Sequence, residues 1–237
     1  MNICTKLALS AAIGALSIAA PAAMAETVDL SFIGHTGLNT VTLNGGTSIY
    51  AGQSFSAGHL THSIDSGPRA GQTYNTFCVE LAERANSGSS TYEIVDLSEA
   101  PRSETPDDAS DNYGVVKAAL VVGVISKAVD LGWIDISLQR MAGSTVDQMS
   151  AIQAMIWAVL YDATASSGDA GVTAALSALT IQTASSSTFN IMESRLRAVV
   201  ADGEQDQLYV VPLPPAVFAG LGMLGSLAGV RTIRRRR

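Results

Sequence analysis

The sequence predicts an α+β fold in which an antiparallel β-sheet or small barrel, formed by the N-terminal half, packs against a helical C-terminal half. Segments with alternating β-branched and aromatic residues lie between residues 27 and 97, as is typical of strands. Between residues 113 and 162, apolar residues instead recur at spacings of three and four, which indicates helices. The roughly 185 residues of this mixed type are sufficient for one domain with a substantial core.

Four segments are expected to be strands, and the turn signal Asn44-Gly45-Gly46 indicates a hairpin. The four segments are residues 27–34, 40–52, 72–81 and 90–97. Cys78 lies in the third of them, with Phe77 and Val79 on the opposite face because side chains alternate along a strand. The acidic stretch at residues 100–112 contains two prolines and no periodicity, so we expect an exposed loop between the two halves.

The C-terminal half is expected to be mainly helical, with one strand that returns to the sheet. The expected helices are residues 113–131, 145–162, 172–179 and 189–200, and the expected strand is residues 207–211. Gly132 is placed to end the first helix. Thr145 and Gln148 match a capping box, which gives the second helix a defined start.

One polar residue, Gln153, interrupts the apolar face of the second helix, which Met149, Ile152, Ile156 and Leu160 mark. Gln153 follows Met149 by four residues and precedes Ile156 by three, so its carboxamide lies among apolar side chains. One interpretation is a buried amide bonded to a neighbouring backbone group, since an unpaired one costs about 1 to 3 kcal/mol. The other makes Gln153 a reaction partner of Cys78.

Residues 1–25 have the features of a secretory signal peptide. Lys6 lies in a short basic head, an apolar run extends from Leu7 to Ala20, and Ala23 and Ala25 form an A-x-A cleavage site. Signal peptidase is therefore an expected partner, with cleavage before Glu26.

Cys4 leaves with the signal peptide, so Cys78 is the only cysteine of the mature chain. An intramolecular disulfide is therefore excluded. In an exported protein, a lone cysteine is buried, paired with another chain or chemically modified. The ordinary interpretation is that Cys78 packs as a small hydrophobic residue.

Charge and motifs argue against several classes of function. Residues 26–210 hold all 21 acidic residues and 8 of the 14 basic residues, a formal charge of −13, which disfavours nucleic acid and anionic lipid as partners. No G-x-S-x-G, P-loop or dinucleotide-binding motif occurs, and no Cys–His signal surrounds Cys78, so neither an enzyme nor a cofactor is predicted.

His59 and His62 form an H-x-x-H pair in a Gly/Ser-rich segment. Zinc sites need three or four ligands at recognisable spacing, and no third ligand lies near this pair. No metal site is predicted, and both histidines are expected in an exposed loop.

Residues 211–237 have three parts in order: a Pro-rich motif, a short apolar run at residues 217–230 that is expected to enter the membrane as a transmembrane helix, and a basic end. The motif is Val211, Pro212, Leu213, Pro214, Pro215 and Ala216, and the basic end holds Arg231, Arg234, Arg235, Arg236 and Arg237. The arginines would stay on the cytoplasmic side of the inner membrane.

This tail resembles the VPLPA-CTERM form of the PEP-CTERM class of sorting signals, found on exported proteins of Gram-negative bacteria, with a doubled proline as one departure. The resemblance implies transient insertion in the inner membrane and cleavage by an exosortase. It also implies release or attachment at the cell surface, often alongside exopolysaccharide. An ordinary C-terminal membrane anchor is the alternative.

The segments FCVEL (77–81) and AIQAMIWAVLYD (151–162) resemble the two halves of the Cys-Gln thioester domains of bacterial surface adhesins. Gln153, Ile156 and Trp157 match the T-Q-x-A-[IV]-W motif of those domains, whereas Ile152 and Met155 replace its Thr and Ala. The resemblance implies a shared fold and a thioester between Cys78 and Gln153 that surface amines or hydroxyls could open.

These observations predict an exported surface protein that acts in adhesion or in a biofilm matrix, with covalent attachment through the Cys78–Gln153 thioester. One alternative is a non-reactive structural matrix protein in which Cys78 is a buried thiol. Another is a carbohydrate-binding module, which would need an exposed aromatic platform. Trp133 and Trp157 both lie in apolar surroundings, so no such platform is visible.

Overall fold

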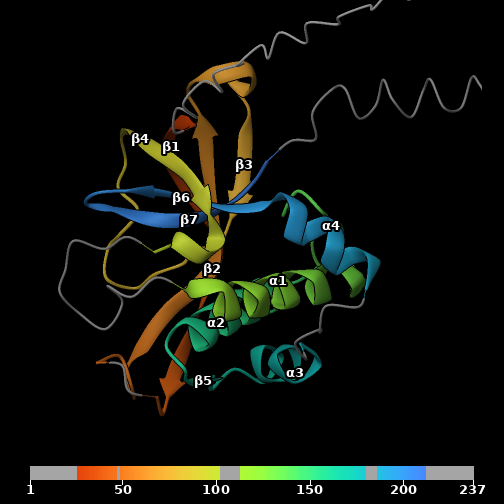
Figure 1. Ribbon diagram of the computed structural model, residues 1–237. Helices are drawn as coiled ribbons and strands as arrows, with labels where there is room; N and C mark the ends of the chain where they lie inside the picture. Colours follow the sequence, from red (N-terminus) through yellow and green to blue (C-terminus); the bar gives the residue numbers. More distant parts are fainter. Residues whose placement is uncertain (1–25, 47–48, 102–112, 180–185, 212–237) are drawn as a thin grey trace, which may run out of the picture.

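The computed structural model describes residues 26–46, 49–101, 113–179 and 186–211, and in these ranges it has a curled antiparallel sheet covered by helices (Figure 1). The strands are β1 (Thr27–Asn44), β2 (Ser54–Ile64), β3 (Thr73–Thr76), β4 (Ser89–Asp96), β5 (Thr164–Ser166), β6 (Leu196–Ala201) and β7 (Glu204–Val210). The helices are α1 (Gly114–Asp130), α2 (Val146–Leu160), α3 (Ala170–Ala178) and α4 (Ser187–Arg195). Two 3₁₀ turns lie at Gly67–Arg69 and Leu97–Glu99. The predicted α+β class is therefore correct.

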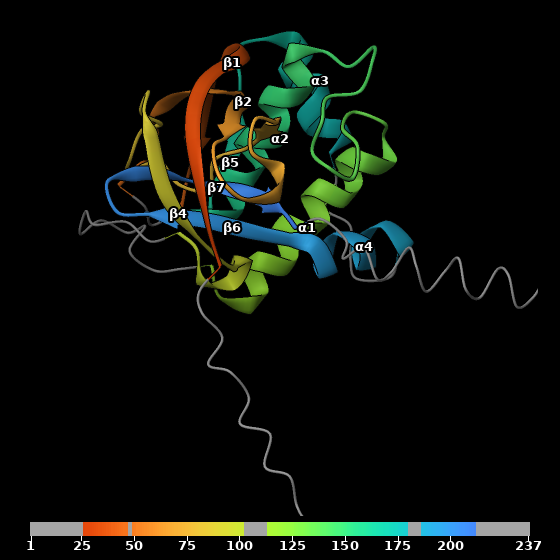
Figure 2. The same ribbon diagram turned by 90° about the horizontal axis from the view of Figure 1, so that it is seen from above.

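The sheet has the strand order β3-β2-β1-β4-β6-β7, and β5 pairs with the end of β1. All of these pairs are antiparallel. The sheet curls into a half-barrel, which Figure 2 shows from above. Its two outer strands, β3 and β7, approach each other beyond Thr76, where Cys78 and Gln207 form a single antiparallel bridge. The curl therefore brings the third and the last strand of the described chain together.

The strand half differs from the prediction at several points. The third predicted strand is shorter than expected: β3 ends at Thr76, and Cys78 lies beyond it in a single bridge to Gln207. Residues 27–34 and 40–44 belong to one 18-residue strand, β1, whose pairing with β2 shifts at Phe32/Gly34 and at Thr36/Leu38. These irregularities are β-bulges, which let a long strand bend without ending it. The segment expected to be a Gly/Ser-rich loop is β2, because pairing with β1 along its length outweighs the low strand propensity of its small residues.

The predicted helix at residues 189–200 is wrong in its second half. Helix α4 ends at Arg195, and Leu196–Ala201 is strand β6, which pairs with both β4 and β7. The β-branched pair Val199 and Val200 suits a strand buried on both faces. The other three predicted helices are present, the last strand begins earlier than expected, and the short strand β5 was not anticipated.

Helix α2 is the central element of the larger core. It contacts β1, β2, α1 and α3, and eleven of its fifteen residues are buried. Thr145 accepts a hydrogen bond from the Gln148 N–H (3.2 Å), and the Gln148 side chain accepts one from the Thr145 N–H (2.9 Å), so the predicted capping box is confirmed. The Gly132 residue that follows α1 has φ +70°, as expected of a residue that ends a helix.

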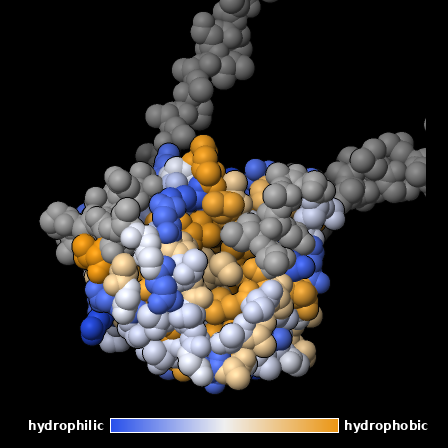
Figure 3. Space-filling model, turned by 90° about the horizontal axis from the view of Figure 1, so that it is seen from below, coloured by the Kyte–Doolittle hydropathy of each residue, from blue (hydrophilic) through white to orange (hydrophobic). Residues whose placement is uncertain are grey.

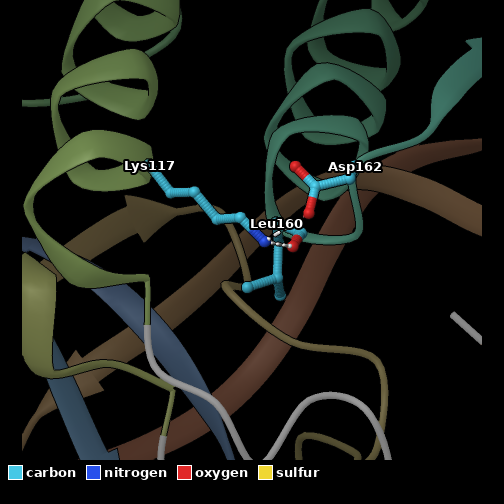
Figure 4. A network of polar contacts seen from close by, with 3 residues as sticks. All are labelled: Lys117, Leu160 and Asp162. Carbon is cyan, nitrogen blue, oxygen red and sulfur yellow. Dashed lines mark hydrogen bonds and ion pairs between the residues drawn. The ribbon is translucent and has the colours of Figure 1, made fainter. Parts of the chain in front are cut away.

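A lysine on α1 holds the end of α2 (Figure 4). The Lys117 ammonium donates to the carbonyl oxygen of Leu160 (2.7 Å) and lies 2.8 Å from the Asp162 carboxylate. A cation at a helix C-terminus satisfies a carbonyl that has no partner within the helix and complements the helix dipole. This contact fixes α1 against the helix that carries Gln153.

Replacement of Lys117 with methionine is expected to lower the free energy of unfolding by about 1 kcal/mol, because the Leu160 carbonyl loses a charge-assisted partner. Asp162→Asn is the matched control. It removes only the ion pair, and because the Asp162 side chain is 68% exposed, its loss should stay within about 0.5 kcal/mol. Urea denaturation of both variants measures the difference, and equal losses would contradict the role assigned to the carbonyl contact.

Figure 3 views the molecule from the side on which α3 and β5 lie, and hydrophobic residues gather in a hollow in the middle of this face. A cavity of about 390 Å³ lies between α2, β5 and α3 on that side, with Met155 and Leu176 among its lining residues. No helix within the described ranges combines the length and apolar character needed to cross a bilayer. The predicted signal peptide, the acidic loop beyond Pro101 and the tail beyond Val211 lie outside the described residues.

Candidate functional site

Cys78 lies where the two outer strands of the half-barrel meet. After β3 the chain pairs with β7: the Leu208 N–H donates to the Phe77 carbonyl oxygen (2.9 Å), and the Val79 N–H donates to that of Asp206 (3.0 Å). Cys78 is a free thiol and is 4% exposed. Phe77 and Val79, predicted to lie on the opposite face, are fully buried as well. The segment is covered on both faces, one of them by α2.

The carboxamide of Gln153 is bonded to the backbone of Cys78. The Cys78 N–H donates to Gln153 Oε1 (2.9 Å), and Gln153 Nε2 donates to the Cys78 carbonyl oxygen (2.8 Å). Gln153 is only 1% exposed, so both ends of its amide are satisfied without water. The structure thus brings the two residues together, in an arrangement that fits both the ordinary interpretation of Gln153 and the reactive one.

Two further side chains of α2 continue this contact along the segment after Cys78. The indole Nε1 of Trp157 donates to the Glu80 carbonyl oxygen (3.1 Å), and the Tyr161 hydroxyl accepts from the Leu81 N–H (2.9 Å). Four residues of a helix advance ~6 Å and two residues of extended chain ~6.6 Å, so the step from Gln153 to Trp157 matches the step from Cys78 to Glu80. Tyr161 bonds to the same peptide unit as Trp157, because the Glu80 carbonyl and the Leu81 N–H belong to one peptide. Successive turns of α2 therefore form hydrogen bonds with backbone groups of residues 78–81 that do not pair with β7.

The electrostatics of the site keep its groups uncharged. Burial raises the pKa of the Cys78 thiol, and the nearby Glu80 raises it further. Glu80 is itself fully buried, and burial together with Asp206 raises the pKa of its carboxyl to about 9. One oxygen of Glu80 accepts the Asp206 N–H at 2.6 Å, so the buried acid also links the Cys78 segment to β7.

At neutral pH the thiol and the acid are both protonated. A protonated thiol is a weak nucleophile, so the site as it stands does not activate Cys78 by a lowered pKa. Two other features favour a reaction between Cys78 and Gln153. The two residues are held close together, and the exclusion of water protects a thioester from hydrolysis once it has formed. Reaction at this site is therefore expected to be slow and its product long-lived.

The remaining predicted residues fall into two groups. Ile156 and Trp157, which match the thioester-domain motif, are 0% and 2% exposed and belong to the core. Val211 lies at the end of the described chain, where its N–H donates to the Arg195 carbonyl oxygen (3.0 Å). The signal-cleavage residues and the rest of the sorting motif and basic end lie outside the described residues.

The expectation that His59 and His62 lie in an exposed loop is wrong. Both are on β2, each is 1% exposed, and burial lowers the pKa of each to about 4, so both imidazoles are neutral at pH 7. The His59 ring stacks on Phe77 at 4.6 Å between centroids, next to Cys78. Within the described ranges, no group of three histidine, cysteine or acidic side chains could hold a metal ion.

Sequence reasoning missed several residues around the Cys–Gln contact. Glu80 reads as a surface acid in an alternating strand, and Tyr113 as the first residue of a helix, yet the Tyr113 hydroxyl donates to the Val79 carbonyl oxygen (3.4 Å). The signal for Tyr161 was available, because Gln153, Trp157 and Tyr161 recur at intervals of four and all carry polar atoms.

The fold and site thus define an α+β protein with a curled antiparallel sheet and a buried cysteine held by the glutamine of a core helix. Comparison of the chain with protein-family models, curated proteins and solved structures gave no match. The likeness to Cys-Gln thioester domains therefore rests on the motifs of this sequence.

Proposed function

We propose that this chain is an exported surface protein, processed at its C-terminus by an exosortase, that acts in adhesion or in a biofilm matrix through an internal thioester between Cys78 and Gln153. The observation that supports the chemistry is the pair of hydrogen bonds between the Gln153 carboxamide and the Cys78 backbone. They hold the electrophilic carbon and the thiol-bearing residue together inside a dry core.

Thioester formation needs no reagent beyond these two side chains. The Cys78 sulfur bonds to the carboxamide carbon of Gln153, the carbon–nitrogen bond breaks, and the thiol proton leaves with the nitrogen as ammonia. A well-oriented pair can have an effective molarity on the order of 10⁵ M or more, which compensates for the weak nucleophile. A surface amine or hydroxyl then opens the thioester, forms an amide or ester with Gln153 and returns the thiol.

A second candidate is a structural matrix protein with the same fold and no reaction. The raised pKa of Cys78 favours it, as does the pairing of both polar atoms of the Gln153 amide, because both describe a stable buried contact. The export and sorting predictions are common to both candidates.

The intact mass of the protein purified from its native envelope distinguishes the two. With the thioester, the mass is lower than that of its residues by one ammonia, and methylamine adds at Gln153. Cys78→Ala, which cannot form the bond, should show its full mass and no methylamine adduct. A full mass for the unaltered protein, with a thiol that titrates on denaturation, would overturn the thioester and leave the structural candidate. The same spectrum gives both chain ends and so tests the two cleavage predictions.

A further inference from the structure

A second cavity lies away from the Cys78–Gln153 contact. It has a volume of about 670 Å³, within the range of small-molecule sites in proteins, and neither Cys78 nor Gln153 lines it. It borders the smaller of the two hydrophobic clusters, which Val28, Ile64, Tyr74 and Tyr209 help to form. These four residues also line the cavity, so most of its surface is apolar.

Two guanidinium groups lie in the wall of this cavity. Arg195 is only 8% exposed and donates to two backbone oxygens over long distances, to Val211 from Nε (3.3 Å) and to Ile136 from Nη1 (3.4 Å). Arg69 is half-buried and donates from Nε to the Gln72 side chain (3.3 Å). Neither makes an ion pair with another part of the described chain, although a buried cation ordinarily has an acidic partner.

Burial lowers the pKa of Arg195, with a smaller lowering from Arg69, whereas Asp135 raises it. Both arginines line the cavity, where their like charges disfavour each other. Glu26 also lines the cavity, and the predicted cleavage before Glu26 would place the α-ammonium group of the mature chain at the same wall. Cationic groups therefore outnumber the carboxylate in this wall, which favours an anionic ligand.

Tyr74 supplies a third polar group. It is 4% exposed, it lines the cavity, and its hydroxyl has no hydrogen-bond partner in the structure. Burial raises the pKa of Tyr74, so the hydroxyl keeps its proton and remains a donor. An unpaired buried hydroxyl is unfavourable. Its oxygen is covered in the unliganded structure, so neighbouring side chains must shift before a ligand oxygen can accept from it and remove the penalty.

We propose that this cavity binds an organic monocarboxylate with an apolar body. Arg69, Arg195 and the Tyr74 hydroxyl receive the carboxylate, and Val28, Ile64 and Ile94 contact the apolar body. Carboxylate groups suit paired guanidinium donors, and the apolar wall rejects small hydrated anions such as phosphate. This site is independent of the proposed thioester.

Equilibrium dialysis with decanoate tests the proposal on the protein isolated from its native cells without detergent. We expect saturable binding at one site, with decanamide, the uncharged analogue, bound at least about tenfold more weakly because it cannot use the arginines. Inorganic phosphate should not compete. Absence of decanoate binding, equal affinity for decanamide, or displacement by phosphate would each overturn the proposal.

Two variants locate the site, and two others are controls. Arg69→Gln should bind decanoate about tenfold more weakly. Tyr74→Phe should bind about fivefold more weakly, and it should fold normally because it removes only an unpartnered hydroxyl. Arg84→Gln, a change at an exposed arginine outside the cavity, is the matched control and should bind as the unaltered protein does. Cys78→Ala should also bind normally, so failure of the thioester and failure of this site are distinguishable. Undiminished binding by both Arg69→Gln and Tyr74→Phe would place the ligand elsewhere.

Discussion

Replacement of Gln153 with leucine is expected to lower the free energy of unfolding by about 2 to 6 kcal/mol, the largest effect of any single change considered for this protein. Leucine has nearly the volume of glutamine but leaves the Cys78 N–H and carbonyl buried without partners. Each such group costs about 1 to 3 kcal/mol. The measurement is urea denaturation in a Cys78→Ala background, which keeps the backbone groups and removes any thioester chemistry.

Gln153→Glu in the same background is the matched control. A protonated glutamate reproduces both hydrogen bonds. An ionised glutamate still accepts from the Cys78 N–H, but its second oxygen has no proton to donate and is repelled by the Cys78 carbonyl oxygen. Burial raises the folded-state pKa of such an acid, so the variant should regain stability as the pH falls through that value. If Gln153→Leu costs less than about 0.5 kcal/mol, a typical surface effect, the contact does not hold the segment.

Glu80→Gln is expected to make the protein more stable than the unaltered chain by more than about 1 kcal/mol at pH 8. The folded-state pKa of Glu80 is raised to about 9, chiefly by burial and then by Asp206. The unfolded chain releases the proton near pH 4.3, so this group makes stability fall as pH rises from about 4.3 to 9. Glutamine keeps the acceptor for the Asp206 N–H and has no proton to lose.

The difference between Glu80→Gln and the unaltered protein should therefore shrink as the pH falls and disappear only below about pH 4. Glu193→Gln, at an exposed position of α4, controls for the loss of one negative charge and should show no such pH-dependent gain. A gain that stays constant from pH 5 to pH 9 would show that the buried acid is not the cause.

Where a local pattern was strong, sequence reasoning placed the element correctly. The capping box at Thr145 and Gln148 fixed the start of α2, and the apolar face of that helix marked Gln153 as a buried polar residue. Local capping and periodicity need no knowledge of distant residues. The same reasoning failed for β2, whose small residues have little strand propensity of their own and become a strand through pairing with β1.

The charge state of the site could not be predicted from the sequence. Nothing in the local sequence distinguishes Glu80 and His59 from exposed polar residues. Only the closure of the half-barrel buries them and shifts their pKa values. The same closure assembles the second cavity, whose two arginines stand 126 positions apart in the chain.

The sequence by itself determined the identity of the pair, because Cys78 is the one cysteine outside the first 25 residues and Gln153 the one polar residue within the apolar stripe of its helix. Their contact was decided only by the tertiary structure. The residues lie 75 positions apart, and they meet because the sheet curls until β3 approaches β7 and α2 packs over the seam. Curl and packing depend on strand order and long-range pairing, which no local pattern encodes.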